Sequence, residues 1–346
     1  MEPQPSHARA GARNLITDIL GLKVGQAHDA AARTGVTVIL PDERSVCACD
    51  VRGGAPGTRE TDALAPETLV EAVDAVVLSG GSVYGLAAAD GVAAWLGARG
   101  RGYRLAADPA VPVSPVIPAA ILFDLANGGD KAWGEAPPYR ALGMAAAAAA
   151  GEDFDLGTAG AGYGAMAGAL KGGIGAASVI ATDAISVGAI VAVNSFGSVT
   201  APGGRTFWAA PFEVGAEFGG LGAAGLAAAP EDWGAAKAPG ALRNTTIACV
   251  ATDVALTPAQ ARRVAIMAQD GLARAIRPIH APFDGDVVFA VSTARRPIPQ
   301  DAADYAVARL GALAADTLAR AVARAAFEAS PWPGVDVACW RDLKDA

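Results

Sequence analysis

The feature that most constrains the fold of this chain is a set of short apolar runs that are hydrophobic on both faces. Residues 175–181 and 185–193 are two such runs, and 247–250 is a third. A strand that is apolar on both faces needs cover on both sides, so its sheet must lie between other layers. Segments with helical spacing alternate with these runs, and the sequence contains no internal repeat and no clean linker. We therefore predict a layered α/β protein with one domain.

Helical patterns supply the covering layers. Apolar residues recur at helical spacing over residues 86–95, which predicts an amphipathic helix after the buried strand that precedes it. Thr257 begins another helix, because a hydroxyl N-cap is followed by Pro258 at the first position and by Gln260, which completes a capping box. Residues 301–329 predict a long alanine-rich helix that begins at Asp301.

Two further segments have a less regular pattern. The β-branched runs at 34–40 and 45–51 are separated by turn residues, which predicts a β-hairpin. Residues 200–243 are rich in Gly, Pro and Ala and form the longest weakly structured stretch. Loops of that length are usually functional or disordered.

Composition excludes several classes of function. The net charge of −8 argues against a nucleic-acid partner, because phosphate binding depends on clustered Lys and Arg. No apolar run reaches the roughly 20 residues that a bilayer span needs, so we expect no membrane partner. Residues 1–13 contain no hydrophobic region of the kind a signal peptide has, and we expect a flexible tail. Together with the four cysteines, which indicate a reducing compartment, this predicts a cytoplasmic protein.

The pair Cys47 and Cys49 has two interpretations. Thiols two residues apart can hold a metal, or they can lie on the same face of a strand whose side chains alternate. The second interpretation is the commoner one, so we expect no metal at this pair. We also expect no organic cofactor.

Familiar catalytic motifs are missing from the sequence. The three histidines are His7, His28 and His280, and neither a G-x-S-x-G elbow nor an H-E-x-x-H motif occurs. The glycine-rich turn "LSGGSVYG" lacks the Gly-Lys-Ser/Thr ending of a P-loop. The glycines there favour close packing or positive φ rather than phosphate contact.

The segment "RNTTIACV" offers different chemistry, because Asn244, Thr245 and Thr246 lie at the mouth of a buried strand. An N-terminal threonine can attack an amide while its own α-amine, with a pKa near 7.7–8.0, accepts the proton. Such a nucleophile must first be exposed by cleavage of the preceding peptide bond, which the hydroxyl itself can perform. Two simpler interpretations stay open: a glycosylation sequon, or a polar strand start.

Longer segments favour the self-cleaving interpretation. In order along the chain they are "NLITDILGLKVGQAHD", "VVLSGGSVYGLAAADGVAAWL", "IPAAILFDLANGGDKAWG", "GAGYGAMAGALKGGIGAAS", "VAVNSFGSV", "NTTIACVATDVALTPAQARRVA" and "DGLARAIRPIHAPFDGDVVFAVST". From about residue 14 to 294 the chain resembles the P1 (S58) peptidase family. That family contains L-aminopeptidase/D-amidase-esterases, β-peptidyl aminopeptidases and pantetheine hydrolases, with the nylon-oligomer (6-aminohexanoate-oligomer) endohydrolases as close relatives.

The resemblance implies a four-layer αββα sandwich, usually assembled as a homotetramer, and a precursor that cleaves itself before its nucleophile. Carried over to this sequence, cleavage falls between Asn244 and Thr245. It gives an α chain of residues 1–244 and a β chain of residues 245–346. Thr245 is then the nucleophile, with Thr246 as the alternative.

The same resemblance implies roles for other residues. Asn194 matches the asparagine that supports the oxyanion. Asp284 and Asp286 match an acidic pair that positions the amine and hydroxyl of the nucleophile in the nylon-oligomer branch, whereas the aminopeptidase branch has Ser and Glu at the corresponding positions. Each also has a simpler explanation, since Asn194 precedes a glycine turn and the two aspartates flank Gly285. Lys171 is the nearest match to an active-site lysine, but many relatives carry that lysine earlier, where this chain has Ala169.

Candidate substrate-binding residues follow from the aromatic side chains. Phe123 stands where the aminopeptidase branch has a tyrosine, which weakens a strict D-aminopeptidase assignment. Tyr84 and Tyr163 lie in glycine turns from which either could contact a substrate.

The function implied is an amide hydrolase that acts on short peptides or peptide-like amides. We place aminopeptidase-type cleavage first and hydrolysis of 6-aminohexanoate oligomers second. Two alternatives of other classes stay open. One is acyl transfer of the kind that ornithine acetyltransferases perform, since those proteins also cleave themselves before a threonine. The other is an uncleaved, inactive scaffold.

Overall fold

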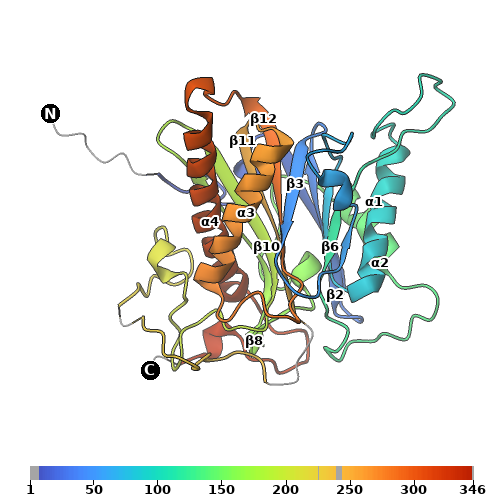
Figure 1. The fold of residues 1–346 in the computed structure, drawn as a ribbon. Helices are drawn as coiled ribbons and strands as arrows, with labels where there is room; N and C mark the ends of the chain where they lie inside the picture. Colours follow the sequence, from blue (N-terminus) through green and yellow to red (C-terminus); the bar gives the residue numbers. More distant parts are fainter. Residues whose placement is uncertain (1–7, 225, 239–243, 345–346) are drawn as a thin grey trace.

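The computed structural model describes residues 8–224, 226–238 and 244–344, and it contains four layers in the order αββα. Figure 1 shows one pair of helices on each outer side and two sheets between them. One outer layer contains α1 (Ala88–Gly97) and α2 (Tyr139–Ala148), and the other contains α3 (Pro258–Ala275) and α4 (Ala303–Phe327). The predicted layered sandwich is therefore confirmed.

Each sheet has five strands. The first has the order β1 (Leu22–Asp29), β2 (Thr34–Pro41), β5 (Val76–Ser79), β6 (Ala119–Ile121) and β4 (Thr58–Arg59). The second has the order β3 (Val46–Val51), β12 (Val287–Arg296), β11 (Thr245–Val254), β10 (Ser186–Asn194) and β9 (Gly173–Ile180). A small separate pair joins β7 (Met166–Ala167) to β8 (Leu170–Lys171). Short 3-10 helices include η3 (Ser82–Ala87), η5 (Ala210–Phe212) and η6 (Gln300–Ala302).

Three apolar clusters fill the three spaces between the layers. One joins α1 and α2 to the first sheet, a second lies between the sheets, and a third joins the second sheet to α3 and α4. Every residue of β10 and β11 is buried, because these central strands have a covered face on both sides.

Small residues allow the helices to lie very close to the sheets. A Cβ atom at Gly25 in β1 would lie 1.8 Å from the carbonyl oxygen of Ala146 in α2, and one at Gly175 in β9 would lie equally close to that of Ala321 in α4. These contacts explain in physical terms why the helices are rich in alanine, since larger side chains would hold the layers apart.

Most predicted elements are confirmed. The apolar runs form β9, β10 and β11. Helix α3 begins with the predicted capping box, in which Thr257 accepts a hydrogen bond from the backbone N–H of Gln260. The last helix begins at Ala303 rather than at Asp301, because a 3-10 turn over Gln300–Ala302 precedes it.

The predicted hairpin between 34–40 and 45–51 is wrong. Strands β2 and β3 belong to different sheets: β2 pairs with β1 and β5, and β3 pairs with β12. Strand pairing depends on which edge is available in three dimensions, and a short link with turn residues can also carry the chain from one sheet to the other.

Of the predicted N-terminal tail, residues 1–7 lie outside the described residues. The remainder is not a free tail in the structure. Arg9 exchanges two backbone hydrogen bonds with Ile180 at the end of β9, and the N–H of Gly11 donates to the hydroxyl of Ser178 at 3.1 Å.

Cys47 and Cys49 follow the alternation of β3. Cys47 is buried in the core between the sheets, where Cys249 also lies, and burial raises the pKa of the Cys47 thiol well above its usual value. Within the described ranges, no group of three or more His, Cys, Asp or Glu side chains has an arrangement that could hold a metal ion. The described helices also include none with both the length and the apolar character needed to cross a bilayer.

Candidate active site

Thr245 and Asn194 lie side by side at one end of the second sheet. Thr245 is the first residue of β11, Asn194 is the last residue of β10, and the two are direct partners in the antiparallel register. This end of the sandwich is the one that carries β8 in Figure 1. The segment between these two residues therefore begins and ends at the same place, so residues 51 positions apart in the sequence become neighbours.

The carbonyl oxygen of Asn244 receives hydrogen bonds from two sides. The hydroxyl Oγ1 of Thr245 donates to it, and the backbone N–H of Gly285 donates to it at 3.1 Å. Gly285 allows this close approach, because a Cβ atom there would lie 2.7 Å from Thr245 Oγ1. A hydroxyl beside a peptide carbonyl and an N–H donor on its oxygen are two of the groups that attack on that carbonyl uses, together with a proton acceptor.

The acidic pair flanks this carbonyl. Asp286 is fully buried: its Oδ1 accepts from the backbone N–H of Thr246 at 2.7 Å, and its Oδ2 lies 2.9 Å from Nδ1 of His280. Asp284 pairs with Asn244 in an isolated parallel bridge, and its Oδ2 accepts from the N–H of Ala281 at 2.9 Å.

Asp284 differs from Asp286 in one respect. Its Oδ1 is buried and has no hydrogen-bond partner among the described residues. Burial, and next the negative charge of Asp286, raise the pKa of Asp284 to about 6, while Lys237 and His280 act in the opposite direction. A buried acceptor without a partner is costly unless another group binds it.

The side-chain amide of Asn194 is held on both sides. Its Oδ1 accepts from the N–H of Met166 at 3.0 Å, and its Nδ2 donates to the carbonyl of Phe123 at 2.9 Å. An amide nitrogen has two N–H donors, so this bond fixes the orientation of the group and leaves one donor for another acceptor.

No described hydrogen bond joins Lys171 to Thr245. Its ammonium donates to the backbone carbonyls of Gly162, Ala165 and Gly172 at 3.3, 3.0 and 2.7 Å. It is fully buried, and burial lowers its pKa to about 7. Because Ala165 directly precedes Met166, this lysine holds the turn whose N–H orients Asn194.

The lysine beside Thr245 is Lys237, which the sequence analysis missed. Its Nζ donates to Asn244 Oδ1 at 2.7 Å and lies 3.3 Å from the main-chain carbonyl oxygen of Asn194. Burial lowers its pKa to about 7, against the attraction of Asp284. It lies in the stretch 200–243, where no periodic pattern marks its position.

The three predicted substrate-binding residues have different environments. Phe123 contributes its backbone carbonyl to Asn194, as described above. Tyr163 is buried and stacks on His28, with ring centroids 4.3 Å apart. Tyr84 is 47% exposed and lies edge-on to Trp133. No described hydrogen bond or ring contact joins either tyrosine to Thr245.

Asp124 is a second buried acid that the sequence analysis did not single out. Its carboxylate accepts from the hydroxyl of Thr34 and from the N–H of Gly81, both at 2.7 Å. Burial raises its pKa to about 6. Because Asp124 follows Phe123, these bonds fix the carbonyl that orients Asn194. The signal in the sequence is the single acidic residue within the apolar segment "ILFDL".

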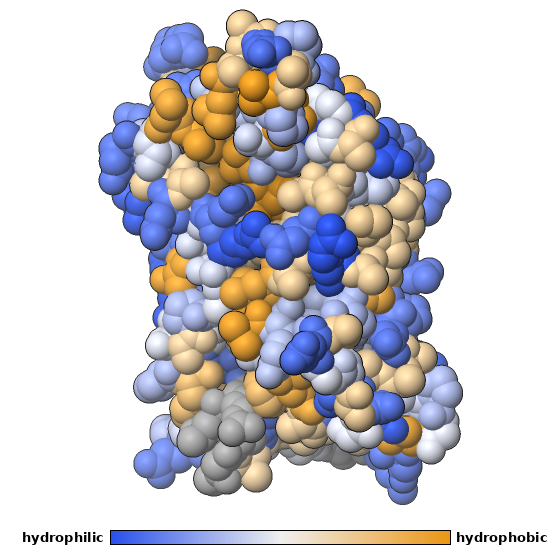
Figure 2. Space-filling model, turned by 90° about the vertical axis from the view of Figure 1, so that its right-hand side faces the viewer, coloured by the Kyte–Doolittle hydropathy of each residue, from blue (hydrophilic) through white to orange (hydrophobic). Residues whose placement is uncertain are grey.

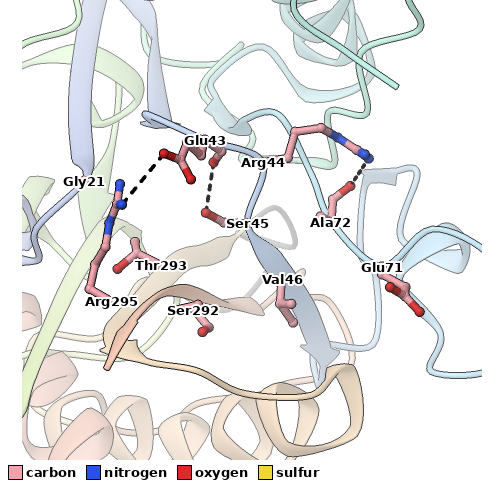
Figure 3. A pocket seen from close by; sticks show the side chains of 11 residues that line it. Gly21, Glu43, Arg44, Ser45, Val46, Glu71, Ala72, Ser292, Thr293 and Arg295 are labelled. Atoms are coloured by element: carbon pink, nitrogen blue, oxygen red, sulfur yellow. Dashed lines mark hydrogen bonds and ion pairs between the residues drawn. The ribbon is translucent and has the colours of Figure 1, made fainter. Parts of the chain in front are cut away.

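A polar cavity of about 260 Å³ lies at the opposite end of the sheets (Figure 3). Arg44, Glu43 and Ser45 line it from the start of β3, and Arg295 lines it from the end of β12. In the register of the second sheet, Ser292 lies five residues along β12 from Val287, which pairs with Ile247 beside the nucleophile. Five residues of a strand span about 17 Å, so the cavity is separate from the Thr245 site.

Comparison with known proteins identifies the family. The profile of peptidase family S58 matches residues 14–339. The chain belongs to this family. It is accordingly a hydrolase of peptide or amide bonds, as the sequence predicted, and the match extends beyond residue 294, where the resemblance was expected to end.

Two relatives from the family cover most of the chain. An aminopeptidase of Mycobacterium tuberculosis (strain H37Rv), named as uncharacterized, is 44% identical over 354 residues, which cover 95% of this chain and 98% of the relative. A 6-aminohexanoate-oligomer endohydrolase of a Kocuria species is 30% identical over 337 residues, with 91% and 87% covered.

The fold has solved counterparts. The L-aminopeptidase D-Ala-esterase/amidase of Ochrobactrum anthropi, described as a variant of the Ntn-hydrolase fold, superimposes with a TM-score of 0.67. The alignment has 20% identity and covers 99% of this chain and 93% of that one. At this identity the likeness concerns the fold alone.

Proposed function

We propose that this S58 peptidase is a self-cleaving amide hydrolase of the aminopeptidase type, and that Thr245 is its nucleophile. One observation carries the proposal: the hydroxyl of Thr245 and the N–H of Gly285 both donate to the carbonyl oxygen of Asn244. The alternative nucleophile Thr246 has less support, because its backbone N–H is bound by Asp286 and its buried hydroxyl has no hydrogen-bond partner among the described residues.

The first reaction is maturation. Thr245 Oγ1 attacks the carbonyl carbon of Asn244, and the N–H of Gly285 stabilises the oxyanion. The bond from that carbon to the nitrogen of Thr245 breaks, the nitrogen takes up a proton, and an ester joins Asn244 to the threonine oxygen. Water hydrolyses the ester and leaves an α chain of residues 1–244 and a β chain of residues 245–346.

The second reaction is turnover, in which the new α-amine of Thr245 is the proton acceptor. The remaining N–H donor of Asn194 Nδ2 stabilises the oxyanion of the substrate. Asp286 fixes the start of β11 through Thr246, and the unpartnered Oδ1 of Asp284 is available to orient the amine. Lys171 acts at a distance, through the turn that holds Asn194.

The proposed substrates are short peptides or peptide-like amides with a free amine. The aminopeptidase of M. tuberculosis, which is 44% identical, supports peptides as the first candidate substrates. Hydrolysis of 6-aminohexanoate oligomers is the second candidate, supported by the 30% identity to the Kocuria endohydrolase and by the acidic pair Asp284 and Asp286.

Denaturing electrophoresis with N-terminal sequencing, followed by two assays, tests the proposal. We expect fragments of 244 and 102 residues (346 − 244 = 102), the smaller beginning at Thr245. The cleaved protein should hydrolyse Ala-p-nitroanilide. Hydrolysis of a 6-aminohexanoate oligomer alone would reverse the order of the two candidates. Brisk hydrolysis of either substrate by an intact single chain would contradict the proposal.

Assembly and location complete the proposal: a homotetramer of αβ units in the cytoplasm. Apolar side chains reach the surface in several patches on the face covered by α1 and α2 (Figure 2), and the exposed Val83, Tyr84 and Met144 belong to these elements or to the turn before them. Light scattering of the cleaved protein would test the tetramer, with a monomeric αβ unit as the contradicting result.

A further inference from the structure

Lys237 binds the side chain of Asn244, the residue whose carbonyl group contacts the proposed nucleophile Thr245. Its Nζ lies 2.7 Å from Oδ1 of Asn244, and Asn244 supplies the acyl group in the proposed maturation. The Asn244 side chain is 2% exposed. Asn244 is therefore a buried residue on the acyl side of the bond to be cleaved, and its side-chain oxygen contacts the ammonium of Lys237.

The position of Lys237 does not depend on the peptide bond that is cut. Its own N–H donates to the carbonyl of Phe196 at 2.9 Å, and the N–H of Ala169 donates to the carbonyl of Ala235 at 2.7 Å. These contacts lie upstream of the cleavage point and join Lys237 to the turns around Asn194. We therefore expect the ammonium to stay in place in the mature protein.

The surroundings suit an acyl group with a polar tip. Phe196, whose carbonyl accepts the backbone N–H of Lys237, has its ring edge-on to Phe283 at 5.0 Å and to Trp233 at 6.0 Å. Asp284 supplies negative charge nearby. An ammonium has three N–H donors, and departure of Asn244 frees the one that the Asn244 side chain now occupies.

Maturation and turnover form the same kind of ester. In both, a bond forms between Thr245 Oγ1 and an acyl carbon, the C–N bond of an amide breaks, and the hydroxyl proton goes to the leaving nitrogen. Water then adds to the ester, which releases a carboxylic acid and restores the hydroxyl. The acyl residue of a substrate therefore becomes bonded to Thr245 Oγ1, the same atom that contacts Asn244 before cleavage.

We propose that Lys237 determines specificity on the acyl side and selects amides whose acyl residue carries a carbonyl or carboxylate oxygen on its γ carbon, as asparaginyl and aspartyl residues do. This inference rests on the proposed function, because it assumes that Thr245 carries the acyl group. It identifies a substrate class that the family assignment does not specify.

The test uses the mature wild-type protein with asparaginyl and leucyl p-nitroanilides, which are nearly equal in size and differ in the γ oxygen and nitrogen. Both are assayed in the L and D forms, and the ratio is taken within the faster series. We expect kcat/KM to favour the asparaginyl amide at least tenfold. Lys237→Met should abolish this ratio mainly by raising KM for the asparaginyl amide, because the contact exists in the ground state as well as in the transition state.

Two further variants keep the result interpretable. Lys237→Arg retains charge and donors and should retain the preference, and the control Lys23→Met, at an exposed ion pair with Asp42, should leave both rates unchanged. If Lys237→Met does not mature while Lys237→Arg does, the acyl group of Asn244 itself requires the contact, which supports the inference.

A wild-type protein that prefers the leucyl amide, or that hydrolyses neither amide, would overturn the inference whatever the variants do. So would a mature Lys237→Met protein with the wild-type ratio. If the proposed function itself is wrong, the result is different: the Thr245→Ala protein would still be cleaved. Amide hydrolysis that depends on Thr245 but shows no asparaginyl preference would remove this inference alone.

Discussion

Asn194 and Thr245 face each other as paired residues on neighbouring strands, one ending β10 and the other beginning β11. Backbone pairing thus fixes the distance between the expected oxyanion donor and the expected nucleophile, without reliance on a flexible loop. Sites built on strands are held more precisely than sites on loops. The predictions below test the groups around this pair.

Thr245→Ala should abolish self-cleavage, because it removes the only hydroxyl that donates to the carbonyl of Asn244 among the described hydrogen bonds. Thr246→Ala is the matched control: its hydroxyl is buried without a described partner, so this protein should still be cleaved. Gel electrophoresis of the two purified variants provides the measurement. An intact Thr246→Ala protein beside a cleaved Thr245→Ala protein would assign the nucleophile to Thr246.

Gly285→Ala should block maturation even though it adds a single methyl group. The new Cβ would lie 2.7 Å from Thr245 Oγ1 and 2.9 Å from the carbonyl oxygen of Ala55, so the hydroxyl or the Asn244 carbonyl must move. Displacements of about 1 Å at a reacting group can cost on the order of 100-fold in rate. The control is Gly97→Ala, where the nearest atom lies 4.0 Å away. Cleavage of Gly285→Ala at the wild-type rate would show that this contact is not needed.

Asn194→Ala and Lys171→Met should both lower kcat, but to different extents. Removal of an oxyanion donor costs roughly 10²–10³ in kcat, and we expect Asn194→Ala to fall in that range. Lys171 acts only through the turn that donates the Met166 N–H to Asn194, so we expect a smaller loss of about tenfold. Steady-state kinetics of matured protein, with a thermal melt to confirm folding, make the comparison. A Lys171→Met protein that loses more than Asn194→Ala would contradict a role for Lys171 that runs only through Asn194.

The rate of self-cleavage should rise between pH 5 and 7. Before cleavage Thr245 has no free α-amine. Of the two carboxylates that flank Gly285, Asp284 has an oxygen without a partner among the described residues, whereas both oxygens of Asp286 are engaged. The pKa of Asp284 is raised to about 6 by burial and by Asp286, so the acid form dominates below that pH and the carboxylate above it. The ionised fraction rises roughly tenfold over this interval, and we expect the rate to follow it.

Two variants separate the groups that titrate in this range. Asp284→Asn should remove the rise near pH 6. We assign any further change near neutrality to Lys237, whose pKa is lowered to about 7. Lys237→Met should remove that change and move the rise near pH 6 to higher pH, because Lys237 lowers the pKa of Asp284. The measurement is the cleaved fraction against time after a pH jump of freshly refolded protein. A flat profile in the wild type would exclude both groups from the step.

The sequence patterns by themselves determined most of the elements and the need for cover on both faces of the strands, while the four-layer order was what the family resemblance implied. Apolar runs without alternation mean strands covered on both faces, and the hydroxyl, Pro258 and Gln260 at the start of α3 specify a helix end through neighbours in the sequence. The motif around Thr245 and the acidic pair were also visible, because their residues lie a few positions apart. These features depend on short-range chemistry, which a linear pattern records.

Only the tertiary structure decided which residues come together. It separated β2 from β3, because a sheet edge exists only after the layers are assembled. It also brought Lys237 to Asn244 and moved Lys171 to a supporting position behind Asn194. Lys237 lies in an irregular segment and Lys171 ends the two-residue strand β8, so the contacts of both are set by how the chain closes on the sheet end rather than by any repeating spacing. The contact between Lys237 and Asn244 therefore could not be identified from sequence position, since what distinguishes this lysine is a distance across the fold.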